Sequence, residues 1–272
     1  MNIVKTDYFD EVESIRLGYG PIGPPLMSVF VYVVDSLVID TGQSHMAKAL
    51  LELLRDKRLS GIVLTHHHED HSGNAAGISA QHSIPVRGRR LTAAKMEGGF
   101  SIRPYQRYVW GKALPVDVIP FDGVIESDRF TFTPVHTPGH ARDHTVFLEK
   151  RQGWLFSGDL YLGERIKFFR ADERFGEQIA SLKKVLALDF DALFCAHNPC
   201  LRNGKQKIKN KLQFLEDLYG SVSELAQKGH SEKAVIKALD PRNDRTIKWI
   251  TMGNVSFANM VRSAMASVRD QC

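Results

Sequence analysis

The chain has 272 residues, of which 43% are hydrophobic and 25% are charged, and its formal net charge is +5 at pH 7. These proportions are typical of folded globular proteins and exclude a disordered or collagen-like chain. The most apolar stretch, from Leu26 to Ile39, is interrupted by Asp35. No run of about 18 apolar residues is therefore present that would predict a membrane-spanning helix.

The N-terminal segment and the cysteines favour a cytoplasmic protein. Residues 1–14 carry acidic side chains where a signal peptide has a basic flank followed by an apolar stretch. The three cysteines have spacings that fit neither a disulfide framework nor a CxxC metal motif. Residues 201–272 hold 13 Lys and Arg against 7 Asp and Glu. Such a basic excess permits contact with nucleic acid, but mixed-sign helical surfaces produce it too.

The first half of the chain predicts strands that alternate with helices. Residues 27–40 are rich in β-branched and aromatic side chains around a polar break at Asp35, which predicts a two-stranded hairpin. Apolar residues recur at helical spacing over 44–58. The short apolar run 61–65 is typical of a strand buried on both faces. Further elements are expected as helices over 72–80 and 91–97 and a strand over 84–86.

The second half repeats this alternation and then becomes helical. Patterns of period two predict strands over 116–119, 129–136, 145–148 and 154–156. A helix over 175–188, a buried strand over 192–195, and helices over 207–227, 231–239 and 254–268 follow. We expect an α/β domain over residues 1–200 and a helical extension over 201–272 that packs on or beside it.

A cluster of metal-binding side chains follows the strand expected at 61–65. The motif HxHxDH is filled by His66, His68, Asp70 and His71. So many polar rings in a short loop are costly to bury unless an ion binds them. Alternate residues of an extended segment point the same way, so His66 and His68 can share one metal while Asp70 and His71 turn toward a second.

Three later residues also follow expected strands. They are His140 in the segment HTPGH, Asp159 in FSGD, and His197 after a buried strand. Open sheets place their functional residues at such strand ends, so these side chains are expected to converge with the His66 loop. Imidazole and carboxylate ligands suit Zn²⁺ first, with Fe²⁺ or Mn²⁺ as alternatives.

With these motifs, the chain resembles the metallo-β-lactamase superfamily through HHHEDHSG, the PGH turn, FSGD and the late histidine. The resemblance covers about residues 27–197 and implies a four-layer αββα sandwich that binds one or two metal ions at its sheet edge. It implies that His66, His68 and His140 hold the first metal. It further implies that Asp70, His71 and His197 hold the second metal, that Asp159 bridges both, and that Asp40 supports the metal loop.

The predicted activity is hydrolysis at a dinuclear centre. Two divalent ions about 3.5 Å apart would lower the pKa of a bridging water and polarise the substrate oxygen. We expect the resulting hydroxide to attack an ester, thioester or lactone carbonyl, with Asp70 and Asp159 as the catalytic carboxylates. A phosphodiesterase or ribonuclease of the same superfamily, or a β-lactamase, is the alternative. Nucleic acid is the less favoured partner, because no RNA-binding module is recognisable.

Glyoxalase II, or hydroxyacylglutathione hydrolase, is the nearest specific likeness, but the chain departs from its glutathione-binding pattern. In that family a lysine follows the bridging aspartate, and a tyrosine that binds glutathione comes two residues later. Lys167 matches the lysine, whereas Phe169 occupies the position of the tyrosine. Segments that mix aromatic residues with cations favour a small-molecule substrate with an anionic group and an apolar body. The residues expected to contact it are Arg103, Tyr105, Tyr108, Tyr161, Arg165 and Lys167.

Overall fold

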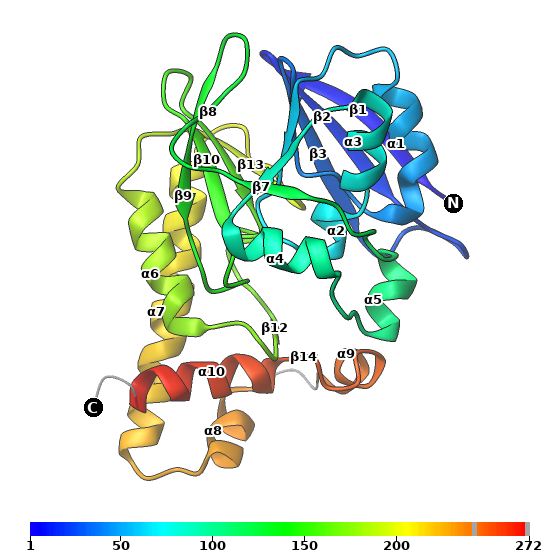
Figure 1. The fold of residues 1–272 in the computed structure, drawn as a ribbon. Coiled ribbons are helices and arrows are strands. Elements are labelled where there is room, and N and C mark those ends of the chain that lie inside the picture. Colours follow the sequence, from blue (N-terminus) through cyan, green and yellow to red (C-terminus); the bar gives the residue numbers. More distant parts are fainter. Residues whose placement is uncertain (241–243, 270–272) are drawn as a thin grey trace.

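Two β-sheets face each other in the centre of the molecule, and helices cover both outer faces (Figure 1). The computed structural model describes residues 1–240 and 244–269. This arrangement is the four-layer αββα sandwich that the resemblance implies, so the predicted fold class is confirmed.

The first sheet has seven strands in sequential order. They are β1 (Ile3–Phe9), β2 (Val12–Gly18), β3 (Ser28–Val34), β4 (Leu37–Ile39), β5 (Gly61–Val63), β6 (Val86–Gly88) and β7 (Val118–Pro120). Neighbours are antiparallel from β1 to β4 and parallel from β4 to β7. The predicted hairpin is β3–β4, whereas β1 and β2 were not predicted.

The second sheet has five strands, in the order β13-β11-β10-β9-β8. They are β8 (Ile125–Glu126), β9 (Thr131–His136), β10 (Thr145–Glu149), β11 (Trp154–Gly158) and β13 (Ala192–Cys195). Only the β11–β13 pair is parallel. Strands β10 and β11 are buried at every position, because the first sheet covers one face and helices cover the other.

Strand β3 shows how the sequence separates the layers. Val29, Val31 and Val33 pack in a cluster with the helices outside the first sheet. Tyr32 and Val34, on the opposite face, pack between the two sheets. The outer helices on this side are η1 (Ser44–Met46), α1 (Ala47–Leu54), α3 (Ala75–His82) and α4 (Arg90–Gly98). Side chains alternate across a strand, so a fully apolar strand supplies both cores.

The helices of the other face include most of the C-terminal extension. They are α6 (Phe175–Leu186), α7 (Gly204–Gln227), α8 (Glu232–Leu239) and α10 (Phe257–Arg269). Ile208 and Leu212 of α7 pack in one cluster with Leu155 and Leu193 of the second sheet. The extension therefore packs on the sandwich, while the boundary at residue 200 stays a prediction. None of the described helices is both long and apolar enough to cross a bilayer.

Short elements complete the chain near one end of the sandwich. They are α2 (Glu69–Ser72), α5 (Pro104–Val109), β12 (Phe169–Arg170), α9 (Arg245–Ile250) and β14 (Val255–Ser256). Strands β12 and β14 form a two-stranded antiparallel sheet. This pairing joins the extension to the loop that follows Asp159. The helix predicted over 254–268 accordingly begins later, at Phe257.

Candidate metal centre

The seven predicted ligands lie where strands of both sheets end. His66, His68, Asp70 and His71 form the loop and first turn after β5. His140 lies in the connection between β9 and β10, Asp159 directly follows β11, and His197 follows β13. Six of these side chains are buried and His197 is half-buried. The structure therefore brings together residues that are widely separated in the sequence.

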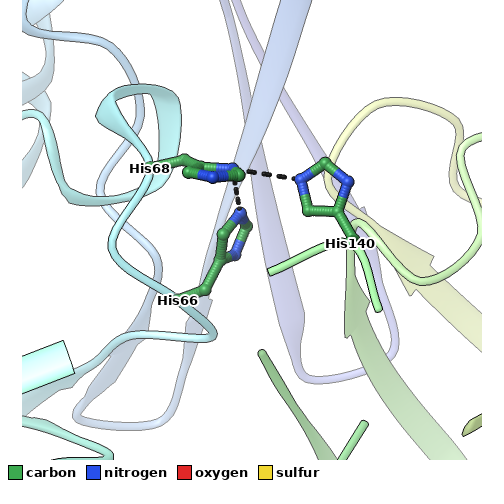
Figure 2. Close-up of side chains that lie close together, drawn as sticks. All are labelled: His66, His68 and His140. Atoms are coloured by element: carbon green, nitrogen blue, oxygen red, sulfur yellow. Dashed lines mark hydrogen bonds between the residues drawn. The ribbon is translucent and has the colours of Figure 1, made fainter. Parts of the chain in front are cut away.

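His66, His68 and His140 form the first of two ligand groups (Figure 2). Nδ1 of His68 lies 2.8 Å from Nε2 of His66 and 3.0 Å from Nε2 of His140. A tetrahedral zinc site with Zn–N bonds of about 2.0–2.1 Å places its nitrogens roughly 3.3 Å apart. One ring hydrogen on His68 Nδ1 can serve only one of its two neighbours. A shared cation would satisfy all three nitrogens.

Asp70, His71, Asp159 and His197 form the second group. Nε2 of His197 lies 3.2 Å from Oδ2 of Asp70. Oδ1 of Asp159 lies 3.3 Å from Nε2 of His71 and 3.4 Å from Nε2 of His197. The other oxygen of Asp159, Oδ2, lies 3.2 Å from Nε2 of His140 in the first group. The Asp159 carboxylate thus spans both groups.

Buried polar atoms in the second group fit a bound cation. Nε2 of His71 and Oδ1 of Asp159 are buried and form no hydrogen bond within the described parts of the chain. Leaving such an atom unsatisfied costs about 1–3 kcal/mol. Imidazoles combined with carboxylates are typical ligands of divalent transition metals. The residues present therefore fit a pair of divalent ions.

Burial and neighbouring charges set the protonation states of the candidate ligands. Burial, followed by neighbouring imidazoles, lowers the pKa of His66 well below its usual value, so its ring is neutral. Burial acts to raise the pKa of Asp159, but the imidazoles of His71, His197 and His140 lower it well below its usual range. Metal ligation needs neutral imidazole and ionised carboxylate. His66 and Asp159 already have these forms. Burial acts to lower the pKa of His71, but Asp159, Asp40 and Asp70 raise it well above its usual value, so a cation would have to displace a proton from its ring.

Asp40, directly after β4, is hydrogen-bonded to the loop that carries the predicted ligands. Its Oδ2 accepts hydrogen bonds from His71 Nδ1 at 2.7 Å and from Thr65 Oγ1 at 2.8 Å. Its Oδ1 accepts from the Thr65 backbone N–H at 2.8 Å. A carboxylate on the outer nitrogen of a ligating histidine fixes the ring orientation and its tautomer. The other nitrogen, Nε2, is then directed at the second group.

Asp143 and His144 also support the centre, although they were not predicted to do so. Burial lowers the pKa of His144 to about 3, and its neutral Nε2 accepts from the Asp159 backbone N–H at 3.1 Å. Asp143 accepts from the ring and the backbone N–H of His67, each at 2.9 Å. In the sequence, the only feature that could have indicated this role was their position directly after the PGH turn. Their function depends on tertiary contacts that spacing does not reveal.

Helix α5 covers the centre beside the metal loop. Gln106 donates to Oε1 of Glu69 at 2.7 Å, and the Trp110 ring lies 5.8 Å from the His197 ring. Asn254 of the extension donates to the Tyr105 hydroxyl oxygen at 2.7 Å. The extension and α5 therefore meet close to the ligands. This places Tyr105 near the centre, whereas Arg103 is exposed.

The other predicted substrate residues are dispersed. Tyr108 is 55% exposed on α5, whereas Tyr161 is buried in a hydrophobic cluster of the core. Because Tyr161 offers no surface, we do not propose a substrate contact for it. Arg165 and Lys167 line a cavity of about 320 Å³ that none of the seven ligands lines. The apolar lining of this cavity consists of Ile166, Phe168, Phe214, Leu218, Leu239 and Phe257.

Two curated relatives of the chain are named for a hydrolytic activity. An atrochrysone carboxyl ACP thioesterase of Paecilomyces divaricatus is 32% identical over 230 residues, which cover 81% of this chain and 62% of that protein. A hydroxyacylglutathione hydrolase of Hahella chejuensis is 31% identical over 175 residues, which cover 62% of this chain and 59% of that protein. The chain thus spans about three fifths of the length of these relatives.

Fold and family comparisons agree with the architecture described above. A metallo-beta-lactamase family protein of Thermus thermophilus superposes with a TM-score of 0.69 at 17% identity, covering 97% of this chain and 94% of that chain. The family model of the metallo-beta-lactamase superfamily matches residues 24–197, which is well over half of the chain. The predicted family is confirmed, and this chain belongs to the metallo-beta-lactamase superfamily.

Proposed function

We propose that this protein is a hydrolase that depends on two divalent metal ions and cleaves an ester or thioester. In this proposal His66, His68 and His140 hold one ion, Asp70, His71 and His197 hold the other, and Asp159 bridges them. The observation that carries it is the Asp159 carboxylate, whose two oxygens lie 3.2 Å and 3.3 Å from nitrogens of the two groups. Zinc is our first choice of metal.

The ions supply the Lewis acidity and the activated water that hydrolysis requires. The chain keeps the ligands in position. Asp40 orients His71 from behind, and His144 fixes the Asp159 backbone. Glu69, next to Asp70, accepts a buried hydrogen bond from Gln106 of α5. A centre oriented in this way is ready for substrate without rearrangement.

A thioester is the substrate class that the relatives support. One relative is named as an ACP thioesterase and another as a hydroxyacylglutathione hydrolase. The departure at Phe169 argues against glutathione as the thiol part. We therefore propose an acyl thioester or ester with a different leaving group, as a small-molecule substrate.

The alternative of a nuclease gains little support from the extension. Every second residue from Lys205 to Lys211, at the start of α7, is a lysine. Of these, Lys211 is 1% exposed and Lys207 pairs with Glu164 at 2.5 Å. Lys205 donates to the Leu188 carbonyl oxygen at 2.7 Å. Lysines engaged in this way are poorly placed to follow a phosphate backbone. Phosphodiesterase activity remains an outcome that the substrate test below would reveal.

Metal analysis together with a substrate panel tests the proposal. The purified protein is expected to contain close to two equivalents of divalent metal, and Asp159→Ala is expected to lose one equivalent and all turnover. The panel comprises acyl thioesters, p-nitrophenyl esters, lactones, β-lactams and bis-p-nitrophenyl phosphate. Full activity after removal of metal by a chelator would refute the proposal. Turnover of the phosphodiester alone would replace it with the nuclease alternative.

A further inference from the structure

A half-buried arginine, Arg170, lies beside the first ligand group and is not needed to hold it. Its backbone N–H donates to Oε1 of Glu173 at 2.9 Å. The other oxygen of Glu173 lies 3.6 Å from Nδ1 of His140. One carboxylate therefore fixes the backbone of Arg170 relative to a predicted metal ligand.

The extension brings a second hydrogen-bond donor to the same place. Arg170 pairs with Val255 in the β12–β14 sheet, and the neighbouring Asn254 donates to the Tyr105 hydroxyl oxygen. Because Asn254 donates, the hydrogen of the Tyr105 hydroxyl is free for another acceptor. Val255 and the adjacent Asn254 thus connect the backbone of Arg170 to the Tyr105 hydroxyl, although 65 positions separate Arg170 and Tyr105 in the sequence. The two side chains are close enough for the charge of Arg170 to act on Tyr105.

The guanidinium group of Arg170 keeps donors unused. Its side chain is 22% exposed, and its Nε lies 3.3 Å from Oδ1 of Asp172, which is itself largely exposed. The two terminal nitrogens have no hydrogen-bond partner within residues 1–240 and 244–269. The nearby carboxylate of Glu69 does not occupy these nitrogens. Within the described residues it forms no ion pair with Arg170, and its Oε1 accepts a hydrogen bond from Gln106 instead.

The charge of Arg170 acts directly on the centre. Burial is the largest cause of the lowered pKa of His68, and the positive charge of Arg170 is the next largest. The same charge opposes the rise of the Glu69 pKa, which burial and Asp70 bring to about 7. A planar guanidinium with free terminal nitrogens matches a carboxylate in a two-pronged hydrogen-bonded pair.

We propose that Arg170, assisted by the Tyr105 hydroxyl, binds a carboxylate group of the substrate next to the metal centre. The inference rests on the proposed function and makes it more specific, because it assigns the substrate an anionic group close to the scissile carbonyl. Arg170 is then a residue that determines specificity, and neutral esters of similar size are poorer substrates.

Binding of a small thiol tests this subsite without turnover. A thiolate is a preferred ligand of zinc, so 3-mercaptopropanoate anchors at the metal and extends its carboxylate, whereas 3-mercaptopropanamide extends a neutral group of similar size. The measured quantity is the ratio of their dissociation constants, determined by calorimetry on the zinc-loaded protein. A charge-assisted hydrogen bond predicts that the wild type prefers the acid about tenfold to a hundredfold.

Substitutions of Arg170 then identify the source of that preference. Arg170→Gln is expected to bring the ratio of the two dissociation constants close to one. Arg170→Lys is expected to leave part of the preference for the acid, because lysine keeps the positive charge but lacks the paired N–H donors of the guanidinium. Arg151→Gln is the matched control, since Arg151 is exposed in the turn before β11, at the opposite end of that strand from Asp159. It should behave as the wild type does.

The outcomes separate this inference from the proposed function. Equal affinities of the acid and the amide in the wild type, or an unchanged preference in both Arg170 variants, would refute the subsite and leave the hydrolase proposal intact. If neither thiol bound to the zinc-loaded protein, the metal centre itself would be wrong, and the subsite would be refuted with it.

Discussion

Replacing Asp40 by Asn should weaken metal binding at the second ligand group while leaving the first intact. The Asp40 carboxylate accepts three hydrogen bonds at 2.7–2.8 Å, two from Thr65 and one from His71 Nδ1. An amide has one oxygen, so whichever way it turns, its NH₂ group faces a donor N–H. Loss of one such charged hydrogen bond costs about 1.5–3 kcal/mol.

The expected loss of metal affinity follows from the position of His71. Carboxylates behind ligating histidines typically contribute tenfold to a hundredfold to metal affinity. This range corresponds to about 1.4–2.8 kcal/mol, which agrees with one lost hydrogen bond. No such partner is lost by His66, whose Nδ1 lies 3.0 Å from Thr65 Oγ1. One of two zinc equivalents should therefore weaken while the other stays within about twofold.

Competition with a chromophoric chelator measures the two stepwise zinc affinities. Asp35→Asn is the matched control, because Asp35 has the same left-handed backbone angle, φ 57°, as Asp40. Asparagine tolerates this conformation in both variants, so backbone strain does not differ. Asp35 accepts instead from the Arg129 backbone N–H, at the other end of β4. Unchanged zinc affinity in Asp40→Asn, or an equal loss at both groups, would refute this reasoning.

Three further predictions concern stability. Burial acts to raise the pKa of Asp143, but hydrogen bonds and charge from His67, with help from Thr92, lower it to about 2. The unfolded carboxyl has a pKa near 3.9, so the ionised group contributes about 2 kcal/mol above pH 4, lost as pH falls toward 2. Urea unfolding should show this acid dependence, and Asp143→Asn should reduce it by about 2 kcal/mol, whereas an unchanged dependence would contradict the assignment. Burial lowers the pKa of Lys211 to about 8, so the unfolded state binds more protons between about pH 8 and 10.4. The unfolding free energy should rise with pH there, and a flat profile, or the same rise in Lys211→Met, would contradict the assignment. Phe156→Ala should cost about 3–5 kcal/mol in chemical denaturation, because the Phe156 ring is 1% exposed and stacks on Phe194 at 4.7 Å. A loss below about 1 kcal/mol would mean that the interface between the sheets relaxes around the cavity.

The layered core could be predicted because burial on both faces imposes continuous apolar runs. Strands β5 and β13 are such runs, and both were predicted. Strand β1 was missed, because it is an edge strand with only partly buried residues and its polar side chains weaken the pattern. Helix α5 was missed as well, since it has six residues and depends on contacts such as that of Gln106 with Glu69.

The candidate site was predictable to the extent that residue type alone indicates chemistry. Histidines and aspartates at strand ends carry a metal signal in their own identity and spacing. Arg170 and His144 carry none, because arginines and histidines are common and their function here depends on contacts from β14 and β11. Tyr161 shows the opposite case, because this aromatic residue is close to Asp159 in the sequence but its side chain is directed into the core.

The two halves of the centre belong to different sheets. The loop after β5 extends from the first sheet, whereas His140, Asp159 and His197 extend from the second. Neither sheet alone can complete a group, so an ion captured by both would act as a cross-link that resists their separation. Metal occupancy and resistance to heat should consequently rise together, and the metal-free protein should be looser and more sensitive to protease.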